Sequence, residues 1–147
     1  MIKNSISKLE FICETIPDKL FKLEERLFNE KTSPNKWSKK EILGHLIDSA
    51  TNNHHRFVKG QYEILPKISY DQNKWNELNF YQLTEKNQLI DFWTLYNKHL
   101  LIIFKNIKSE NLKNEINTGG IENCTIEFLI NDYIEHLEHH LNQIIEL

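Results

Sequence analysis

Apolar residues recur at the three- and four-residue spacing of an amphipathic helix in four long runs of this sequence. The 147 residues include only four glycines and three prolines, so breakers are rare and their positions mark the ends of helices. Amphipathic helices of this length bury their apolar stripes against one another. We therefore expect an all-α fold, a four-helix bundle that forms a single domain over residues 1–147.

The first two runs carry clear boundary signals. The first extends over about residues 4–29, and Pro17 interrupts it, either as a kink or because a second helix begins near Thr15 with the proline in its first turn. The second begins at Ser38, which opens a capping box, and ends at Gly60. These signals predict a helix of about six turns after residue 38.

The composition of the chain changes after the second helix. Residues 60–83 are rich in polar and turn-forming residues and predict a long crossover to the third helix, with at most a short helical turn near 71–78. The third helix is expected over about 84–107. Residues 109–123 predict a surface loop, with or without a small hairpin, before Thr125 caps the last helix.

Three of the seven histidines lie close together on the last helix. On a helical wheel His140 falls within the apolar arc and His136 at its edge, whereas His139 falls outside, among charged residues. His136 and His140 are four residues apart, so they can chelate one cation. They can equally be core histidines satisfied by hydrogen bonds, and for the pair alone both interpretations stay open.

The second helix shows a similar layout. A line of polar residues borders its apolar face: His45, Ser49, Asn52 and Arg56. Such a line taken alone is typical of the solvated edge of an amphipathic helix. Two helices that each place histidine at the core margin can, however, supply three neutral nitrogens to one divalent ion and leave a position for water or substrate. His45, His136 and His140 are therefore the candidate metal ligands.

The other histidines are placed at the surface or in the core according to the direction in which each projects from its helix. His54 and His55 point away from the line of His45, so we expect both at the surface. His99 lies near Tyr96 and Ile103 on the third helix and has three interpretations: a core histidine, a group that supports the ligands, or a fourth ligand. We favour the core histidine.

Composition excludes several classes of function. The formal charge is −3, with 27% charged residues and no basic block, so neither nucleic acid nor an anionic membrane is an expected partner. The N-terminal residues lack the apolar region of a signal peptide, and the longest apolar run, 100–104, is too short to cross a bilayer. We expect a cytoplasmic protein in which Cys13 and Cys124 are free thiols.

A series of short motifs follows in a fixed order along the chain. They are Lys36–Ile42, His45–Ser49, Asn52, Arg56-Phe57, Pro66, Tyr70-Asp71, Trp75–Leu78, Tyr133, His136, His139-His140 and Gln143-Ile144. Their order and spacing resemble the DinB/YfiT-like family of metalloenzymes, and the YfiT branch in particular, over nearly the whole chain. The sequence differs from that branch at His99, which stands where an aromatic residue is expected, and in the polar loop before the last helix.

The resemblance implies a four-helix bundle whose three histidines bind a divalent metal, at His45, His136 and His140 here. Relatives of this kind are often homodimers. They include metal-dependent transferases and isomerases that use low-molecular-weight thiols such as bacillithiol, mycothiol or glutathione. Imidazole suits several transition metals, of which zinc or nickel is expected.

The expected function is therefore metal-dependent S-transfer from such a thiol to a small electrophilic substrate. The ion would lower the pKa of the thiol. Arg56 and Asn52 are the candidate catalytic residues, which would bind carboxylate or amide groups of the thiol.

Two other functions stay open. The same three ligands would serve a metal-dependent hydrolase, although Asp48 and Glu135, two carboxylates close in sequence to the ligands, project away from them. The third possibility is a non-catalytic stress protein that only binds metal or ligand.

Overall fold

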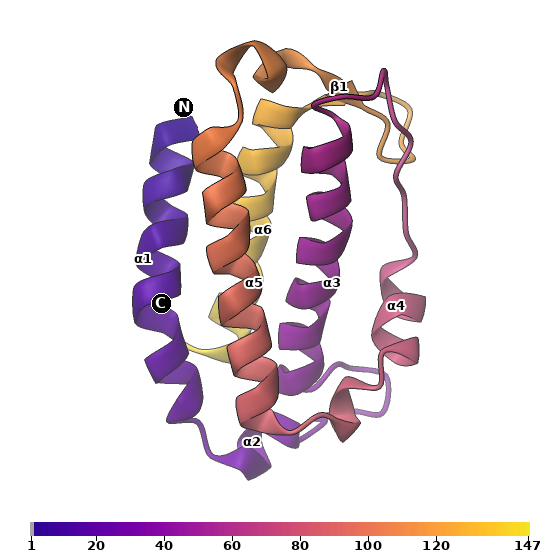
Figure 1. Ribbon diagram of the computed structural model, residues 1–147. Coiled ribbons are helices and arrows are strands. Elements are labelled where there is room, and N and C mark those ends of the chain that lie inside the picture. Colours follow the sequence, from indigo (N-terminus) through magenta and orange to yellow (C-terminus); the bar gives the residue numbers. More distant parts are fainter. Residues whose placement is uncertain (1) are drawn as a thin grey trace.

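Four long helices pack side by side in the computed structural model, which describes residues 2–147 (Figure 1). They are α1 (Ile2–Phe21), α3 (Lys39–Lys59), α5 (Lys86–Asn106) and α6 (Ile126–Ile144). The connections contain the short helices α2 (Glu25–Asn29) and α4 (Gln72–Leu78), the 3-10 turns η1 (Tyr81–Leu83) and η2 (Ser109–Lys113), and the strands β1 (Glu115–Ile116) and β2 (Cys124–Thr125). The expected four-helix bundle is confirmed.

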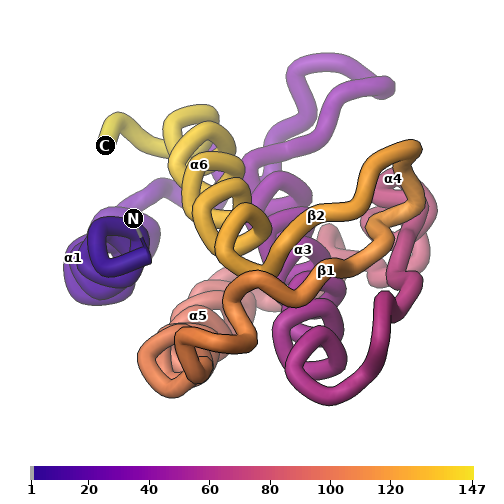
Figure 2. The backbone as a smooth tube through the Cα atoms, turned by 90° about the horizontal axis from the view of Figure 1, so that it is seen from above, coloured from indigo at the N-terminus to yellow at the C-terminus, as the bar shows by residue number. Residues whose placement is uncertain are grey.

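The order of the helices around the bundle is unusual. Helix α1 packs against α5 and α6, and α3 packs against the same two helices. Figure 2, a view from above, shows that α1 and α3 therefore lie on one diagonal and α5 and α6 on the other. Helices α3 and α5 run in the same direction because the crossover between them returns the chain along the outside of the bundle (Figure 1). This confirms the long crossover predicted between the second and third helices.

The first helical run differs from the prediction. Helix α1 continues through Pro17 and ends at Phe21, and α2 follows after a short break. No helix begins near Thr15, and the run does not reach residue 29 as one helix. Proline removes a single backbone hydrogen bond, and the stripe that α1 buries on both sides of it, including Ile12 and Ile16, continues without interruption.

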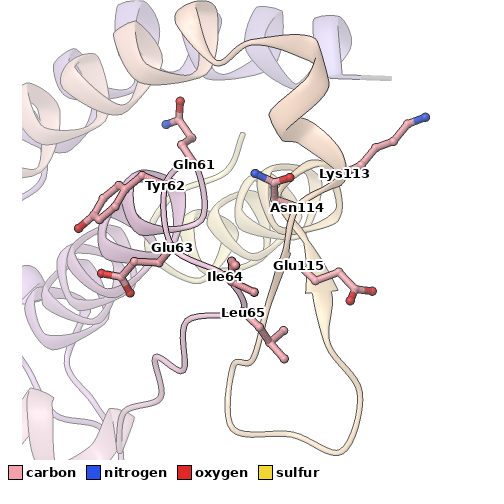
Figure 3. Close-up of a pocket in the computed structure, with 8 residues that line it drawn as sticks. All are labelled: Gln61, Tyr62, Glu63, Ile64, Leu65, Lys113, Asn114 and Glu115. Atoms are coloured by element: carbon pink, nitrogen blue, oxygen red, sulfur yellow. The ribbon is translucent and has the colours of Figure 1, made fainter.

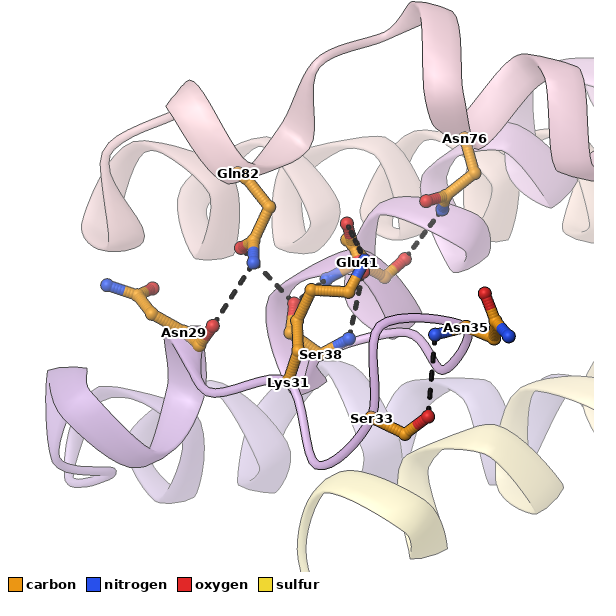
Figure 4. A network of polar contacts seen from close by, with 8 residues as sticks. All are labelled: Asn29, Lys31, Ser33, Asn35, Ser38, Glu41, Asn76 and Gln82. Carbon is orange, nitrogen blue, oxygen red and sulfur yellow. Dashed lines mark hydrogen bonds and ion pairs between the residues drawn. The ribbon is translucent and has the colours of Figure 1, made fainter.

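The start of α3 is the best anchored element boundary. Ser38 accepts a hydrogen bond from the backbone N–H of Glu41 at 3.0 Å, and the Glu41 carboxylate accepts one from the N–H of Ser38 at 2.9 Å. Figure 4 shows how this capping box is tied to its surroundings. Gln82 contacts both Ser38 and the carbonyl of Asn29, and Asn76 donates to the carbonyl of Glu41. The first turn of α3 is thereby joined to both the crossover and α2.

The connection before α6 is a small hairpin. Strands β1 and β2 pair antiparallel, with Glu115 opposite Thr125, and Thr125 also caps α6 by accepting from the N–H of Phe128. Both cysteines are free among the described residues, and Cys13 is buried in the core. Within residues 2–147 we find no helix with the length and apolar character needed to cross a membrane.

Candidate metal centre

His45, His136 and His140 come together between α3 and α6. One nitrogen from each side chain lies within 4.8 Å of the others. The Nε2 atoms of His45 and His136 are 3.0 Å apart. The ring centroids are separated by 4.9 Å for His45 and His136, 4.7 Å for His45 and His140, and 4.5 Å for His136 and His140. The structure thus brings together the three residues selected from the sequence.

Burial keeps two imidazoles of the cluster, those of His45 and His136, neutral. His45 is 1% exposed, and His136 and His140 are half-buried. Burial, reinforced by the neighbouring histidines, lowers the pKa of His45 to about 3 and that of His136 to about 4. At neutral pH both rings are therefore uncharged, which is the form that binds a metal ion.

The donor set fits a transition-metal ion. Two nitrogens bound to one ion at about 2.0–2.1 Å each lie roughly 3 Å apart, as the Nε2 atoms of His45 and His136 do. The buried Nδ1 atoms of the same two rings have no hydrogen-bond partner in residues 2–147. No carboxylate joins the cluster within this part of the chain. Three nitrogen donors suit zinc, nickel, copper or iron, whereas calcium and magnesium prefer oxygen.

Two further residues support the ligands. Gln143 accepts a hydrogen bond from Nδ1 of His140 at 2.9 Å when that nitrogen carries the proton, which leaves the lone pair on Nε2. The ring of Trp37 packs on that of His45, with the centroids 4.8 Å apart. Both residues belong to motifs noted in the sequence, but sequence reasoning gave neither a role at the metal site. The spacing of three residues between His140 and Gln143 on one helix is the signal that could have identified the second contact.

A pocket of about 550 Å³ opens beside the cluster. It is lined by Trp37 and Gln143, each of which contacts one of the candidate ligands. Its other walls are mixed in character, with the apolar Leu27 and Ile42, the charged Lys36, Lys39 and Glu30, and Thr32. None of the three histidines lines this pocket, and it reaches them only through Trp37 and Gln143.

A second pocket lies at the opposite end of α3. It has a volume of about 560 Å³ and is lined by residues 61–65 and 113–115 (Figure 3). His45 is about 22 Å away from Gly60 along the helix axis. Unlike Trp37 and Gln143 in the first pocket, the residues that line this one lie at the far end of α3 from the histidines, so it does not belong to the histidine site.

Arg56 and Asn52 lie on the same helix as His45 but do not bond to the cluster. The Asn52 amide donates to the carbonyl of Asp48 at 2.9 Å. The Arg56 guanidinium donates through Nε and Nη2 to the carbonyl of Ile68 at 3.2 and 3.0 Å, and through Nη1 to Asn53 at 3.2 Å. Arg56 therefore holds the crossover against α3. It is 9% exposed and forms no ion pair with any described carboxylate, so its charge is not neutralised.

Asp48 faces the crossover. Its Oδ1 accepts hydrogen bonds from the Tyr81 hydroxyl at 2.5 Å and from Asn79 at 2.9 Å. Burial raises the pKa of this carboxyl to about 6, against the opposing effect of these two bonds. Asp48 thus bonds to the crossover and not to the candidate metal ligands. Glu135, the other carboxylate considered from the sequence, is exposed.

The other histidines only partly follow the predictions. His55 is exposed as expected, and His54 is half-buried, with Nδ1 3.1 Å from the Tyr96 hydroxyl. The favoured interpretation of His99 as a core residue is wrong, because His99 is exposed. Helix α5 instead turns Asn97 into the core, where its side-chain oxygen accepts a hydrogen bond from Tyr133 at 2.7 Å.

Comparisons with known proteins agree with this fold. Residues 18–144 match the DinB superfamily. Proteins of Bacillus cereus strain AH820 and Bacillus anthracis strain A0248, both named as candidate metal-dependent hydrolases, are 22% identical over the whole chain and 85% of each relative. YfiT from Bacillus subtilis, described as a probable metal-dependent hydrolase with an unusual four-helix bundle topology, shares the fold with a TM-score of 0.86 and 19% identity, over 97% of this chain and 83% of YfiT. The chain belongs to the DinB superfamily.

Proposed function

We propose that this protein is a metal-dependent S-transferase, with a divalent ion held by His45, His136 and His140. The observation that carries the proposal is the cluster of three imidazoles, next to a pocket that Trp37 and Gln143 line. When bound there, the ion supplies the positive charge that lowers the pKa of a thiol. The sulfur then forms a bond to an electrophilic carbon, the leaving group departs with its electron pair, and the thiol proton passes to solvent.

The charge of the site favours a thiol as the nucleophile. Three neutral ligands leave the full double positive charge of an ion uncompensated, and such a site attracts an anionic sulfur. Activation of water benefits from a nearby carboxylate base. Within residues 2–147 the cluster includes none, and Asp48 is turned to Tyr81.

Arg56 is the residue that we propose binds a carboxylate of the thiol. Three of its five N–H groups donate to Ile68 and Asn53, and the other two remain for a ligand. It lies about 16 Å from His45 along α3, and its side chain extends back toward the start of the helix, which shortens this gap. Asn52, one turn closer to His45, is proposed to bind an amide of the same ligand.

The test is turnover by metal-loaded protein with a panel of thiols and alkylating electrophiles. We expect S-transfer by the native chain and by His139→Ala, whose exposed side chain lies next to a ligand, and a loss of at least about 100-fold in His136→Ala. Arg56→Ala should retain its metal and lose transfer. Unchanged transfer in Arg56→Ala would remove the role proposed for this residue.

Hydrolysis is the second candidate, because the relatives and YfiT are named or described as metal-dependent hydrolases. The same three histidines would hold an ion that activates water. Ester and amide substrates offered without any thiol separate the two activities. Metal-dependent cleavage under these conditions would favour the hydrolase. A protein that binds metal and turns over neither group of substrates would contradict both enzymatic proposals and leave a binding protein.

A further inference from the structure

A second pair of histidines meets on another face of the bundle. His54 belongs to α3 and His99 to α5, two helices that pack side by side and run in the same direction (Figures 1 and 2). Their ring centroids are 5.5 Å apart, with an angle of 73° between the ring planes. His54 follows His45 by nine residues, which is two and a half turns, so the two side chains project from opposite faces of α3.

The spacing of this pair suits a shared ion. Two imidazoles that bind one tetrahedral ion at about 2.0–2.1 Å have ring centroids roughly 5 Å apart. The pairs within the first cluster are separated by 4.5–4.9 Å, and the separation of His54 and His99 exceeds this range by only a few tenths of an ångström. A small change in the rotamer of the exposed His99 closes the difference.

One ring of the pair is already oriented. Nδ1 of His54 is hydrogen-bonded to the Tyr96 hydroxyl at 3.1 Å, so Nε2 remains for a ligand, and Tyr96 fixes the ring as a supporting residue does in metal sites. Burial lowers the pKa of His54, and His99 and His55 act in the same direction. The ring is therefore mostly neutral at pH 7 and able to bind a cation.

The surroundings leave room for the rest of a coordination sphere. A hollow of about 380 Å³ adjoins His54 and is lined by residues of the last turns of α3, including His55 and Val58. His99 is exposed. Water molecules can therefore complete the coordination of an ion that has only two protein ligands.

We propose that His54 and His99 form a second binding site for a divalent transition metal, separate from the first cluster. Imidazole nitrogens select zinc, nickel or copper, and the two-ligand site is weaker and more readily exchanged than the three-histidine site. An ion bound by this pair links α3 to α5. Helix α3 also carries His45 of the first cluster, whereas α5 carries none of its ligands.

The test is a zinc titration of metal-free protein, followed by competition with a chromogenic chelator. We expect two ions per chain in the native protein, with the second bound more weakly. His99→Gln should bind one ion. His136→Ala combined with His140→Ala should also bind one, and adding His99→Gln to this variant should abolish binding. Circular dichroism checks that each variant is folded.

Lys98→Gln is the matched control, since Lys98 is exposed and next to His99 in sequence. It should keep both ions. The proposal is overturned if the native protein binds a single ion, if His99→Gln still binds two, or if Lys98→Gln loses the weaker one. None of these results depends on turnover, so this proposal and the proposed S-transferase activity can fail independently.

Discussion

Neighbouring residues on α6 have different surroundings and therefore different expected roles. His139 is exposed, whereas His140 is half-buried, and Gln143 contacts both, through Nε2 to His139 at 3.4 Å and through Oε1 to Nδ1 of His140 at 2.9 Å. The side-chain oxygen of Gln143 determines which nitrogen of His140 carries the proton and so which one faces the other two histidines. A single hydrogen bond thus prepares a ligand for the metal.

Gln143→Leu should weaken metal binding. Without the acceptor, His140 is no longer held in one tautomer, and the loss of such a supporting contact lowers metal affinity by about 10- to 100-fold. Competition with a chelator measures this change. Asn142→Leu, at an exposed position beside it, is the control and should bind as the native protein does. Equal affinities of Gln143→Leu and the native protein would show that the contact does not support the site.

Asp48 predicts a pH dependence of stability. Burial raises its pKa from 3.8 to about 6, so the folded chain holds this proton more tightly than the unfolded chain does. Protonated Asp48 therefore contributes to the free energy of unfolding, fully below about pH 4, and this contribution is lost as the pH rises through about 6. The loss amounts to about 3 kcal/mol. Denaturant unfolding of native protein and Asp48→Asn measures it. The native protein should lose stability relative to the variant over this range, and a constant difference would contradict the assignment.

At the scale of elements, the turn η1 of the crossover packs against α3 at Gly44, which has no side chain. A Cβ atom built on Gly44 would lie 2.1–2.6 Å from the ring of Tyr81, whose hydroxyl bonds to Asp48 one turn further along. The glycine therefore lets η1 lie directly against α3. This contact fixes the crossover near the histidine cluster.

Gly44→Ala should therefore destabilise the protein. Alanine in a helix normally gains about 1 kcal/mol over glycine, but here the overlap with Tyr81 forces the crossover to shift, at a cost of roughly 1–3 kcal/mol or more. Thermal unfolding measures the net loss. Gly120→Ala is the matched control, because a Cβ there meets no atom within 4 Å. A Gly44→Ala protein as stable as the control would show that η1 is not packed as described.

Local signals explain which elements could be predicted from the sequence. The capping box at Ser38 depends only on residues of the same turn, and it fixed the start of α3 correctly. For Pro17 the sequence left open a kink or a new helix near Thr15, and the structure excludes the second, because the stripe that α1 buries continues on both sides of the proline. Long-range packing is absent from a periodicity analysis.

The candidate site shows the same division. His45, His136 and His140 could be identified because each lies at the margin of an apolar stripe, and periodicity gives that position. The orientation of α5 could not be predicted in this way. The helix buries Asn97, a polar residue, which bonds to Tyr133 in the core. That partner lies on another helix, so His99 was placed on the wrong side.

At the scale of the whole molecule, the cluster joins two helices that are far apart in the sequence. An ion bound by His45 and His136 would connect α3 to α6 and stabilise only the folded chain. At a free zinc concentration 100 times the dissociation constant, the stabilisation is about 2.7 kcal/mol, or roughly 5–10 °C in Tm. Thermal unfolding with and without zinc should show most of this shift lost in His136→Ala. An equal shift in both proteins would place the stabilising ion elsewhere.

The metal content of protein purified without a nickel column, and then dialysed to remove weakly held ions, tests the central claim most directly. Elemental analysis should find one divalent transition-metal ion per chain in the native protein and in His139→Ala, and none in His45→Ala. A native protein without metal, or a His45→Ala variant that retains its ion, would contradict a metal centre built from α3 and α6.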